Sequence, residues 1–252
     1  MGAWVETASE HFTARHGEED AEHADGVLRR LEAMRARLVG LVDPLPDEVA
    51  VVLHASEGQL ALARPALPLR RWLTAPAARR YVAGAVSGTE IHVLSPPLLE
   101  ARASGAEGSA EMLARTPAAL YARLAVGHAS RRLPPPARIG TVVRAWRWAW
   151  LVEGIGAWLS GQTALARAAI ARRLHEGPPP AFPPALRDAV LLGGTVVDLL
   201  AREEGEAAAV RFAVDLDPAG PRDGLVRAFH GRRLDHTEAT WRAHLARLAG
   251  TD

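Results

Sequence analysis

Two residues that could form part of a metal centre, His128 and Glu153, lie 25 positions apart in this chain. The histidine belongs to the segment LYARLAVGHASRRL, and the glutamate is the single acid of the apolar segment WAWLVEGIGAWLSG. Imidazole nitrogens and carboxylate oxygens are both common zinc ligands. A zinc hydrolase also needs an open coordination position for water and a carboxylate that takes the proton of that water. The two segments therefore hold half of a zinc site.

Together, these two segments resemble the paired helices of the gluzincin zinc peptidases, most closely those of the peptidase-MA-like proteins. Gluzincins carry H-E-x-x-H on one helix and a glutamate ligand on the next, commonly roughly 20 residues later and often in a W-L-x-E-G context. The resemblance implies that Glu153 is the third ligand and His128 a motif histidine. It extends, with less specific motifs, from the strand EHFTARHG to the closing segment TEATWRAHLARL.

The H-E-x-x-H motif is incomplete in both possible alignments. With His128 as the first histidine, the general base falls on Ala129 and the second ligand on Arg132. With His128 as the second histidine, the first ligand falls on Leu124 and the base on Ala125. We prefer the first alignment because its separation from the glutamate is closer to the usual one. In either alignment an alanine methyl group replaces the base, and it can neither bind zinc nor accept a proton.

The carboxylate of Glu153 needs a partner, because it lies in an apolar helix and an unpaired buried charge costs several kcal/mol. The candidates are a metal ion, His128 or one of the arginines Arg132, Arg144 and Arg147. We expect an ion pair within about 4 Å, with Arg132 or His128 as the favoured partner. Loss of the arginine from such a pair should destabilise the fold by roughly 3 kcal/mol, and Glu153→Gln should cost less.

Purely structural interpretations compete with these functional ones. His128 shares a helix face with Tyr121 and Arg132, because residues four and seven positions apart align. A lone histidine in that setting is more often a hydrogen-bonded core residue than a ligand. Arg132 either supplies the positive charge of the missing zinc or is a solvated arginine at a helix end. Gly154 and Gly156 indicate close approach of another helix.

The composition limits the classes of function. A chain of 252 residues with 48% hydrophobic and 23% charged residues fits a soluble globular protein. Its 30 basic residues, all arginine, face 29 acids, and this balance argues against nucleic-acid binding. The absence of cysteine excludes disulfides, thiolate nucleophiles and Cys-ligated zinc. No signal-peptide pattern or long apolar run is present, so we expect a cytoplasmic protein without membrane contact, unless a leader was removed.

The N-terminal part, residues 1–108, is expected to form a small mixed β-sheet with helices. The predicted elements are a strand near 5–15, a helix with Val27, Leu28, Leu31, Met34 and Leu38 that stops at Gly40, a strand at Val49–His54, a helix capped by Ser56, and a hairpin of YVAGAV and TEIHVL around Ser87-Gly88. Residues 64–80, rich in proline and arginine, are predicted to be a loop.

The C-terminal part, residues 109–252, is expected to be mostly helical. Helices are predicted near 109–132, 141–160, 162–174, 185–202, 205–213 and 236–249, with proline-rich breaks at Pro134–Pro136 and Pro178–Pro184. The Gly193-Gly194 pair lies inside a helical pattern, so it indicates close helix packing rather than a phosphate loop. The order of elements predicts a gluzincin-like α+β fold over residues 1–252 as a single domain, in which the His128 helix packs on the sheet and the Glu153 helix crosses it.

These observations lead to a non-catalytic, metallopeptidase-like protein, a degenerate gluzincin that acts in binding or regulation through a retained cleft. The vestigial cleft consists of His128, Ala129, Arg132, Glu153 and Tyr121, holds no cofactor, and would take a peptide or protein ligand. One alternative is an active zinc metallohydrolase with His128 and Glu153 as atypical ligands. Another is a helical interaction module without a cleft ligand. The ligand, the oligomeric state and the completion of a metal site by a distant histidine stay open.

Overall fold

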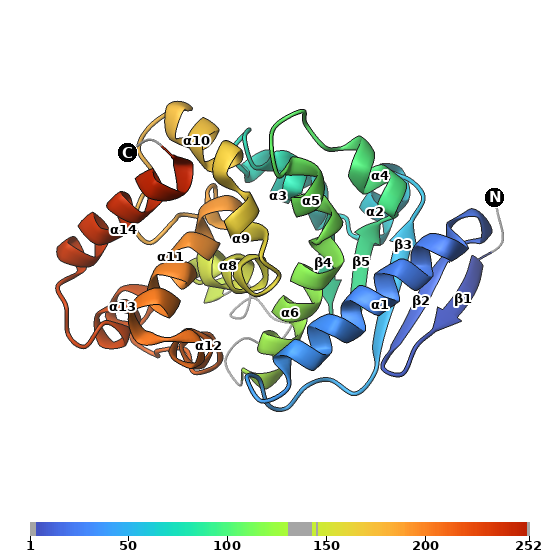
Figure 1. Cartoon of the computed structure of the whole chain (residues 1–252), viewed down its shortest axis with the longest axis horizontal. Coiled ribbons are helices and arrows are strands. Elements are labelled where there is room, and N and C mark those ends of the chain that lie inside the picture. Colours follow the sequence, from blue (N-terminus) through green and yellow to red (C-terminus); the bar gives the residue numbers. More distant parts are fainter. Residues whose placement is uncertain (1–3, 131–142, 145, 251–252) are drawn as a thin grey trace.

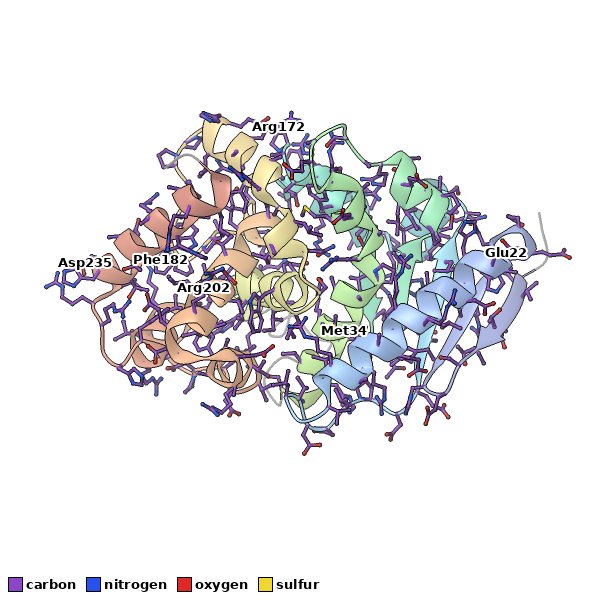
Figure 2. The ribbon with its side chains drawn as sticks, in the orientation of Figure 1. Glu22, Met34, Arg172, Phe182, Arg202 and Asp235 are labelled. Carbon is purple, nitrogen blue, oxygen red and sulfur yellow. The ribbon has the colours of Figure 1, made fainter. Side chains whose placement is uncertain are left out.

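The protein has an α+β fold, as predicted, in which a mixed sheet in the N-terminal part is followed by a mostly helical C-terminal part (Figure 1). The computed structural model describes residues 4–130, 143–144 and 146–250. Figure 2 shows Glu22 and Asp235 at opposite ends of the long axis of the molecule. The sheet therefore occupies one end of the molecule, and the last helices occupy the other.

Five strands form one sheet with the order β1-β2-β3-β5-β4. Their bounds are β1 Trp4–Ala8, β2 Phe12–Gly17, β3 Val49–His54, β4 Gly84–Ser87 and β5 Glu90–Leu94. The three central strands β2, β3 and β5 are parallel, and the edge strands β1 and β4 run antiparallel to their neighbours. The predicted strand at Val49–His54 and the predicted hairpin around Ser87-Gly88 are both confirmed.

The prediction of one strand near residues 5–15 is wrong, because this segment forms the hairpin of β1 and β2. The turn between them contains no glycine, proline or asparagine that would mark it in the sequence. A distant residue holds the turn instead. Ser9 Oγ and the backbone N–H of His11 both donate hydrogen bonds to the Glu32 carboxylate, at 2.7 and 2.9 Å.

Two helices, α1 (Ala21–Leu38) and α6 (Thr116–Ala129), pack against each other and against the sheet. The five apolar residues of the predicted α1 face are all buried, and Gly40 follows the helix with a φ of +80°. Helix α6 contacts β4 and β5, which confirms that the His128 helix packs on the sheet.

Residues 64–80 contain helix α3 (Ala66–Leu73) and a 3₁₀ turn at Arg79–Tyr81, so the predicted loop is wrong. Pro65 and Pro68 stand at the N-cap and in the first turn of α3, where a helix needs no backbone N–H donor. The preceding helix α2 (Glu57–Ala63) begins as predicted, because Ser56 Oγ accepts a hydrogen bond of 3.1 Å from the N–H of Gln59.

Among the remaining helices, the mostly buried α11 contacts α8, α9, α10, α12 and α14. Their bounds are α4 Pro96–Ala101, α5 Ser109–Ala114, α8 Ala149–Leu159, α9 Gln162–Leu165, α10 Arg167–His175, α11 Ala189–Glu204, α12 Glu206–Val214, α13 Pro221–Ala228 and α14 Leu234–Ala249. The predicted helix near 109–132 is thus two helices, α5 and α6, and the one near 162–174 is also two, α9 and α10. Helix α13 was not predicted, and the break at Pro134–Pro136 lies outside the described residues.

Helix α8 lies between α6 and α11, and glycines allow both approaches. A Cβ atom added at Gly193 of α11 would overlap the carbonyl oxygen of Trp150 on α8. One added at Gly156 of α8 would overlap the carbonyl oxygen of Ala119 on α6. The close helix packing predicted for these glycines is confirmed. In the part of the chain that the structure describes, no helix combines the length and hydropathy needed to cross a membrane.

Candidate functional site

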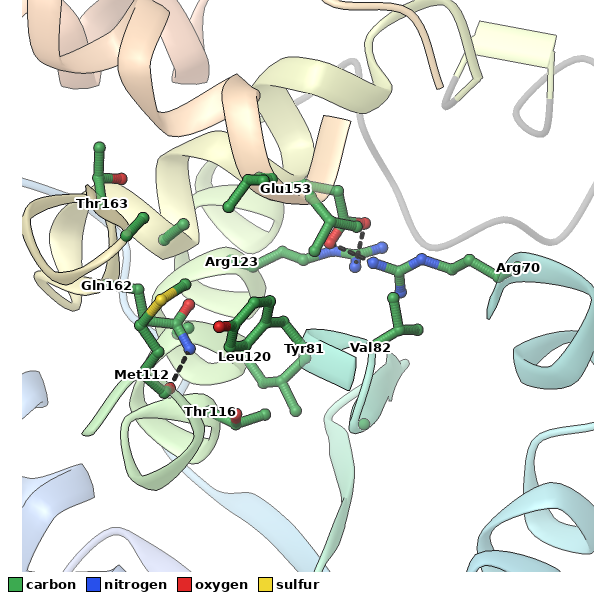
Figure 3. A pocket seen from close by; sticks show the side chains of 16 residues that line it. Arg70, Tyr81, Val82, Met112, Thr116, Leu120, Arg123, Glu153, Gln162 and Thr163 are labelled. Atoms are coloured by element: carbon green, nitrogen blue, oxygen red, sulfur yellow. Dashed lines mark hydrogen bonds and ion pairs between the residues drawn. The ribbon is translucent and has the colours of Figure 1, made fainter. Parts of the chain in front are cut away.

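Glu153 lies on α8 with its carboxylate between two arginines that come from two other helices (Figure 3). Arg123 of α6 donates a hydrogen bond from Nη1 to Oε1 at 2.6 Å, and Arg70 of α3 forms an ion pair from Nη2 to Oε2. The Glu153 side chain is 16% exposed, and the arginine side chains are 24% and 25% exposed. We call these three residues the Arg–Glu–Arg cluster.

The expected ion pair of Glu153 with a basic group is confirmed, but neither favoured partner is seen to form it. Arg132 lies outside the described residues. His128 does not pair with Glu153, and Arg147 donates its hydrogen bond to the backbone oxygen of Ala219 instead. The charge that Glu153 requires thus comes from residues that the sequence did not single out.

His128 is exposed near the end of α6, and among the described residues it has no hydrogen bond or ion pair. It stands five positions after Arg123, which places it about 140° around the helix from that arginine. Ala119 and Arg123, four positions apart on α6, both meet α8. Neither alignment of the H-E-x-x-H motif places a ligand position at Arg123, and His128 is also not the buried core residue of the structural interpretation.

Tyr121 belongs to the packing between α6 and the sheet rather than to a cleft with Glu153. Its ring lies edge-on to Phe12 of β2 with a centroid distance of 4.8 Å, and its hydroxyl accepts a hydrogen bond of 3.3 Å from Arg35 Nη1. Burial raises the pKa of Tyr121, and the Arg35 guanidinium acts in the opposite direction. Ala129 is the half-buried last residue of α6. The described residues of the predicted vestigial cleft are therefore not brought together.

The electrostatics of the Arg–Glu–Arg cluster are asymmetric, since two guanidinium groups face one carboxylate. Burial lowers the pKa of Arg123, Glu153 raises it, and the neighbouring Arg70 lowers it again. Arginine keeps its proton at neutral pH despite such shifts, so two positive charges minus one negative charge leave a net charge of +1. The surroundings of the cluster consequently favour an anion over a cation.

The cluster forms one wall of a cavity of about 50 Å³ at the junction of the sheet and the helical part. The lining residues come from several elements and are Arg70, Tyr81, Val82, Gly84, Met112, Thr116, Ala119, Leu120, Arg123, Glu153, Ala157, Gln162, Thr163, Ala166, Val190 and Leu191. Glu153 is the only acid among them. The hydroxyl groups of Thr116 and Thr163 are buried and have no hydrogen-bond partner in the described part of the chain. Both oxygens are enclosed by protein atoms, and the Thr163 hydroxyl lies against the backbone of Gly194, so neither faces the open space of the cavity.

Sequence reasoning missed Arg70 and Arg123, the two cations of the site. A signal for Arg123 exists, because the small residues Ala119 and Gly127 stand four positions before and after it and allow close approach of another helix. Arg70 carries no comparable signal, because it lies in the segment that was expected to be a loop.

A separate histidine pair lies on neighbouring parallel strands, His54 of β3 and His92 of β5. Their rings are joined by a hydrogen bond of 3.1 Å between His54 Nε2 and His92 Nδ1, and His92 Nε2 lies 3.4 Å from Glu90. Burial and the charge of His92 lower the pKa of His54 to about 4. Across the described residues, no three His, Cys, Asp or Glu side chains are arranged to hold a metal ion.

Comparison with known proteins does not assign the chain to a family. No family model matches the sequence, and a search of curated proteins found no significant match. The function is therefore inferred from the geometry of the Arg–Glu–Arg cluster and its cavity.

Proposed function

We propose that this protein is a non-catalytic, metallopeptidase-like protein, a degenerate gluzincin that acts in binding or regulation. One observation carries the proposal: both oxygens of Glu153 are engaged by guanidinium groups, from Arg70 and Arg123. In the gluzincins that the sequence resembles, the corresponding glutamate would bind zinc. In this proposal the two arginines take over the role of the metal, and they supply positive charge without Lewis-acid chemistry.

Two physical arguments support a binding role over hydrolysis. A zinc ion at Glu153 would have to displace two charge-assisted hydrogen bonds and lie beside two positive charges that do not titrate near neutral pH. A hydrolase also needs a second carboxylate or similar base to take a proton from water. Glu153, the only acid of the described cavity lining, is already paired.

The size of the cavity restricts what this site would bind. Pockets for drug-sized ligands measure about 300–1,000 Å³, whereas this cavity measures about 50 Å³. A peptide segment would therefore have to bind outside the cavity, and a guest inside it would be a small group.

Metal content tests the proposal. Purified protein should hold zinc far below one equivalent, and 1,10-phenanthroline should leave its melting temperature unchanged, because a metal that binds the folded state raises that temperature. Peptide hydrolysis should stay at background. One equivalent of zinc that is lost in Glu153→Gln would contradict the proposal and support the active metallohydrolase instead.

A further inference from the structure

We infer that the cavity beside the Arg–Glu–Arg cluster is a binding site for a small monocarboxylate of two or three carbons. The inference builds on the proposed binding function and adds the chemical class of the ligand. Figure 3 shows the two guanidinium groups at one end of the site, with Thr116, Gln162 and Thr163 toward the other.

The charge of the ligand follows from the unused donors of the arginines. Within the described part of the chain, Arg70 and Arg123 each bind Glu153 through one nitrogen atom. Their other guanidinium nitrogens are absent from the enclosed polar atoms that lack a partner, so they stay open to the cavity or to solvent. Because the net charge of the cluster is +1, a ligand with one negative charge neutralises it and has the most favourable electrostatic energy. The planar fork of each guanidinium matches the geometry of a carboxylate.

The size of the ligand follows from the volume of the cavity. A water molecule needs about 10–15 Å³ of such space, and the cavity offers about 50 Å³. It therefore holds about four water molecules or a ligand of about four non-hydrogen atoms. Acetate has this size, and propionate and glycolate are one atom larger.

The walls distinguish an organic carboxylate from an inorganic anion. Val82, Leu120 and Leu191 line the cavity and offer an apolar surface to a methyl or methylene group. Chloride and phosphate have no carbon atoms to place there. The hydroxyl oxygens of Thr116 and Thr163 are enclosed by protein atoms, so the polar contacts of the ligand come from the guanidinium groups.

The test is a titration of the metal-free 252-residue protein with ¹³C-labelled acetate, propionate and glycolate, followed by ligand-observed NMR at pH 7 and constant ionic strength. For four non-hydrogen atoms the Kd is no tighter than roughly 0.04 mM, so we expect a value in the millimolar range or somewhat below. Acetamide, a neutral molecule of the same shape, should bind at least about tenfold more weakly, since it lacks the charge that strengthens the hydrogen bonds.

Three variants show whether binding occurs in this cavity. Arg70→Met and Arg123→Met should each weaken acetate binding at least about tenfold. Arg64→Met removes a positive charge after α2, outside the cavity lining, and should leave the affinity unchanged. Far-UV circular dichroism melts verify that each variant is folded.

Several outcomes would overturn the inference. They are no acetate binding up to about 100 mM, equal binding of acetamide, equal loss in Arg64→Met and Arg70→Met, or stronger binding of chloride or phosphate than of acetate. Because the titration uses protein treated with 1,10-phenanthroline, its result is independent of zinc content. A failed titration with no zinc bound would thus reject the ligand class alone, whereas stoichiometric zinc would reject the proposed function.

Discussion

Arg123 Nη1 donates a hydrogen bond of 2.6 Å to Glu153 Oε1, and this contact joins helix α6 to helix α8. The second oxygen of the same carboxylate pairs with Arg70 of α3, so one negative charge serves two guanidinium groups. The three residues hold three helices together at the junction of the sheet and the helical part. We therefore expect the stability of the site to depend on the balance between two positive charges and one negative charge rather than on a single ion pair.

We predict that Glu153→Gln destabilises the fold more than either arginine substitution, by about 3 kcal/mol against about 1–2 kcal/mol for Arg70→Met or Arg123→Met. Loss of Glu153 leaves two half-buried positive charges facing each other, whereas loss of one arginine leaves a complete ion pair. Urea unfolding measures the free energies. If Glu153 had only one arginine partner, loss of that arginine would cost more stability than Glu153→Gln, which is the order expected from the sequence alone. Observation of that order would contradict the three-residue arrangement.

We predict that Gly193→Ala destabilises the protein by about 3 kcal/mol, because the added methyl group meets the carbonyl oxygen of Trp150 across the α8–α11 contact. The matched control is Gly26→Ala in α1, where a Cβ atom meets nothing within 4 Å. That change should be neutral or stabilise by up to about 1 kcal/mol, through the better helix propensity of alanine. Equal melting temperatures of the two variants would show that the glycine contact is looser than described.

The histidine pair predicts a loss of stability in mild acid. Burial and His92 lower the pKa of His54 to about 4, against about 6.5 in the unfolded chain. Between these values the unfolded state binds more protons than the folded state, so the free energy of unfolding falls as the pH falls from about 6.5 to about 4. Protonation of His54 lowers the free energy of unfolding by about 3 kcal/mol once the pH has fallen to about 4. Above pH 7 it has no effect, because His54 is neutral in both states.

The variant His54→Gln isolates this contribution from the carboxylates that titrate at similar pH. Urea unfolding from pH 7.5 to pH 4 should show a smaller fall in stability for His54→Gln than for the natural protein. His92, whose pKa is also lowered by burial, stays in both proteins together with Glu90 and Arg64 beside it. Parallel curves for the two proteins would contradict the prediction.

Peptidase activity should not be restored by completing the base position of the sequence motif. Ala129 is the last residue of α6, and the exposed His128 beside it points away from the helix face that carries Arg123. Ala129→Glu with added zinc should therefore hydrolyse fluorogenic peptides no faster than buffer does. Turnover by the natural protein that disappears in His128→Ala would show that the metallohydrolase interpretation is correct.

The local elements of this protein could be predicted because their signals are local. The strand Val49–His54 is a short β-branched run, the buried face of α1 follows the helical period, and the hydroxyl of Ser56 caps α2 through a residue three positions away. Helix α3 was missed because prolines, which usually break helices, are harmless at its start.

The sequence by itself determined that Glu153, in an apolar helix, needs a positive partner, since desolvation of a carboxylate depends only on its surroundings. Only the tertiary structure decided which of the 30 basic residues would serve. Arg123 and Arg70 stand 30 and 83 positions before Glu153. Arg123 reaches it because α8 approaches α6 at Gly156, and Arg70 reaches it from α3 through its long side chain. Helix periodicity defines a face within one helix, but the angle and depth at which two faces meet come from packing over the whole chain.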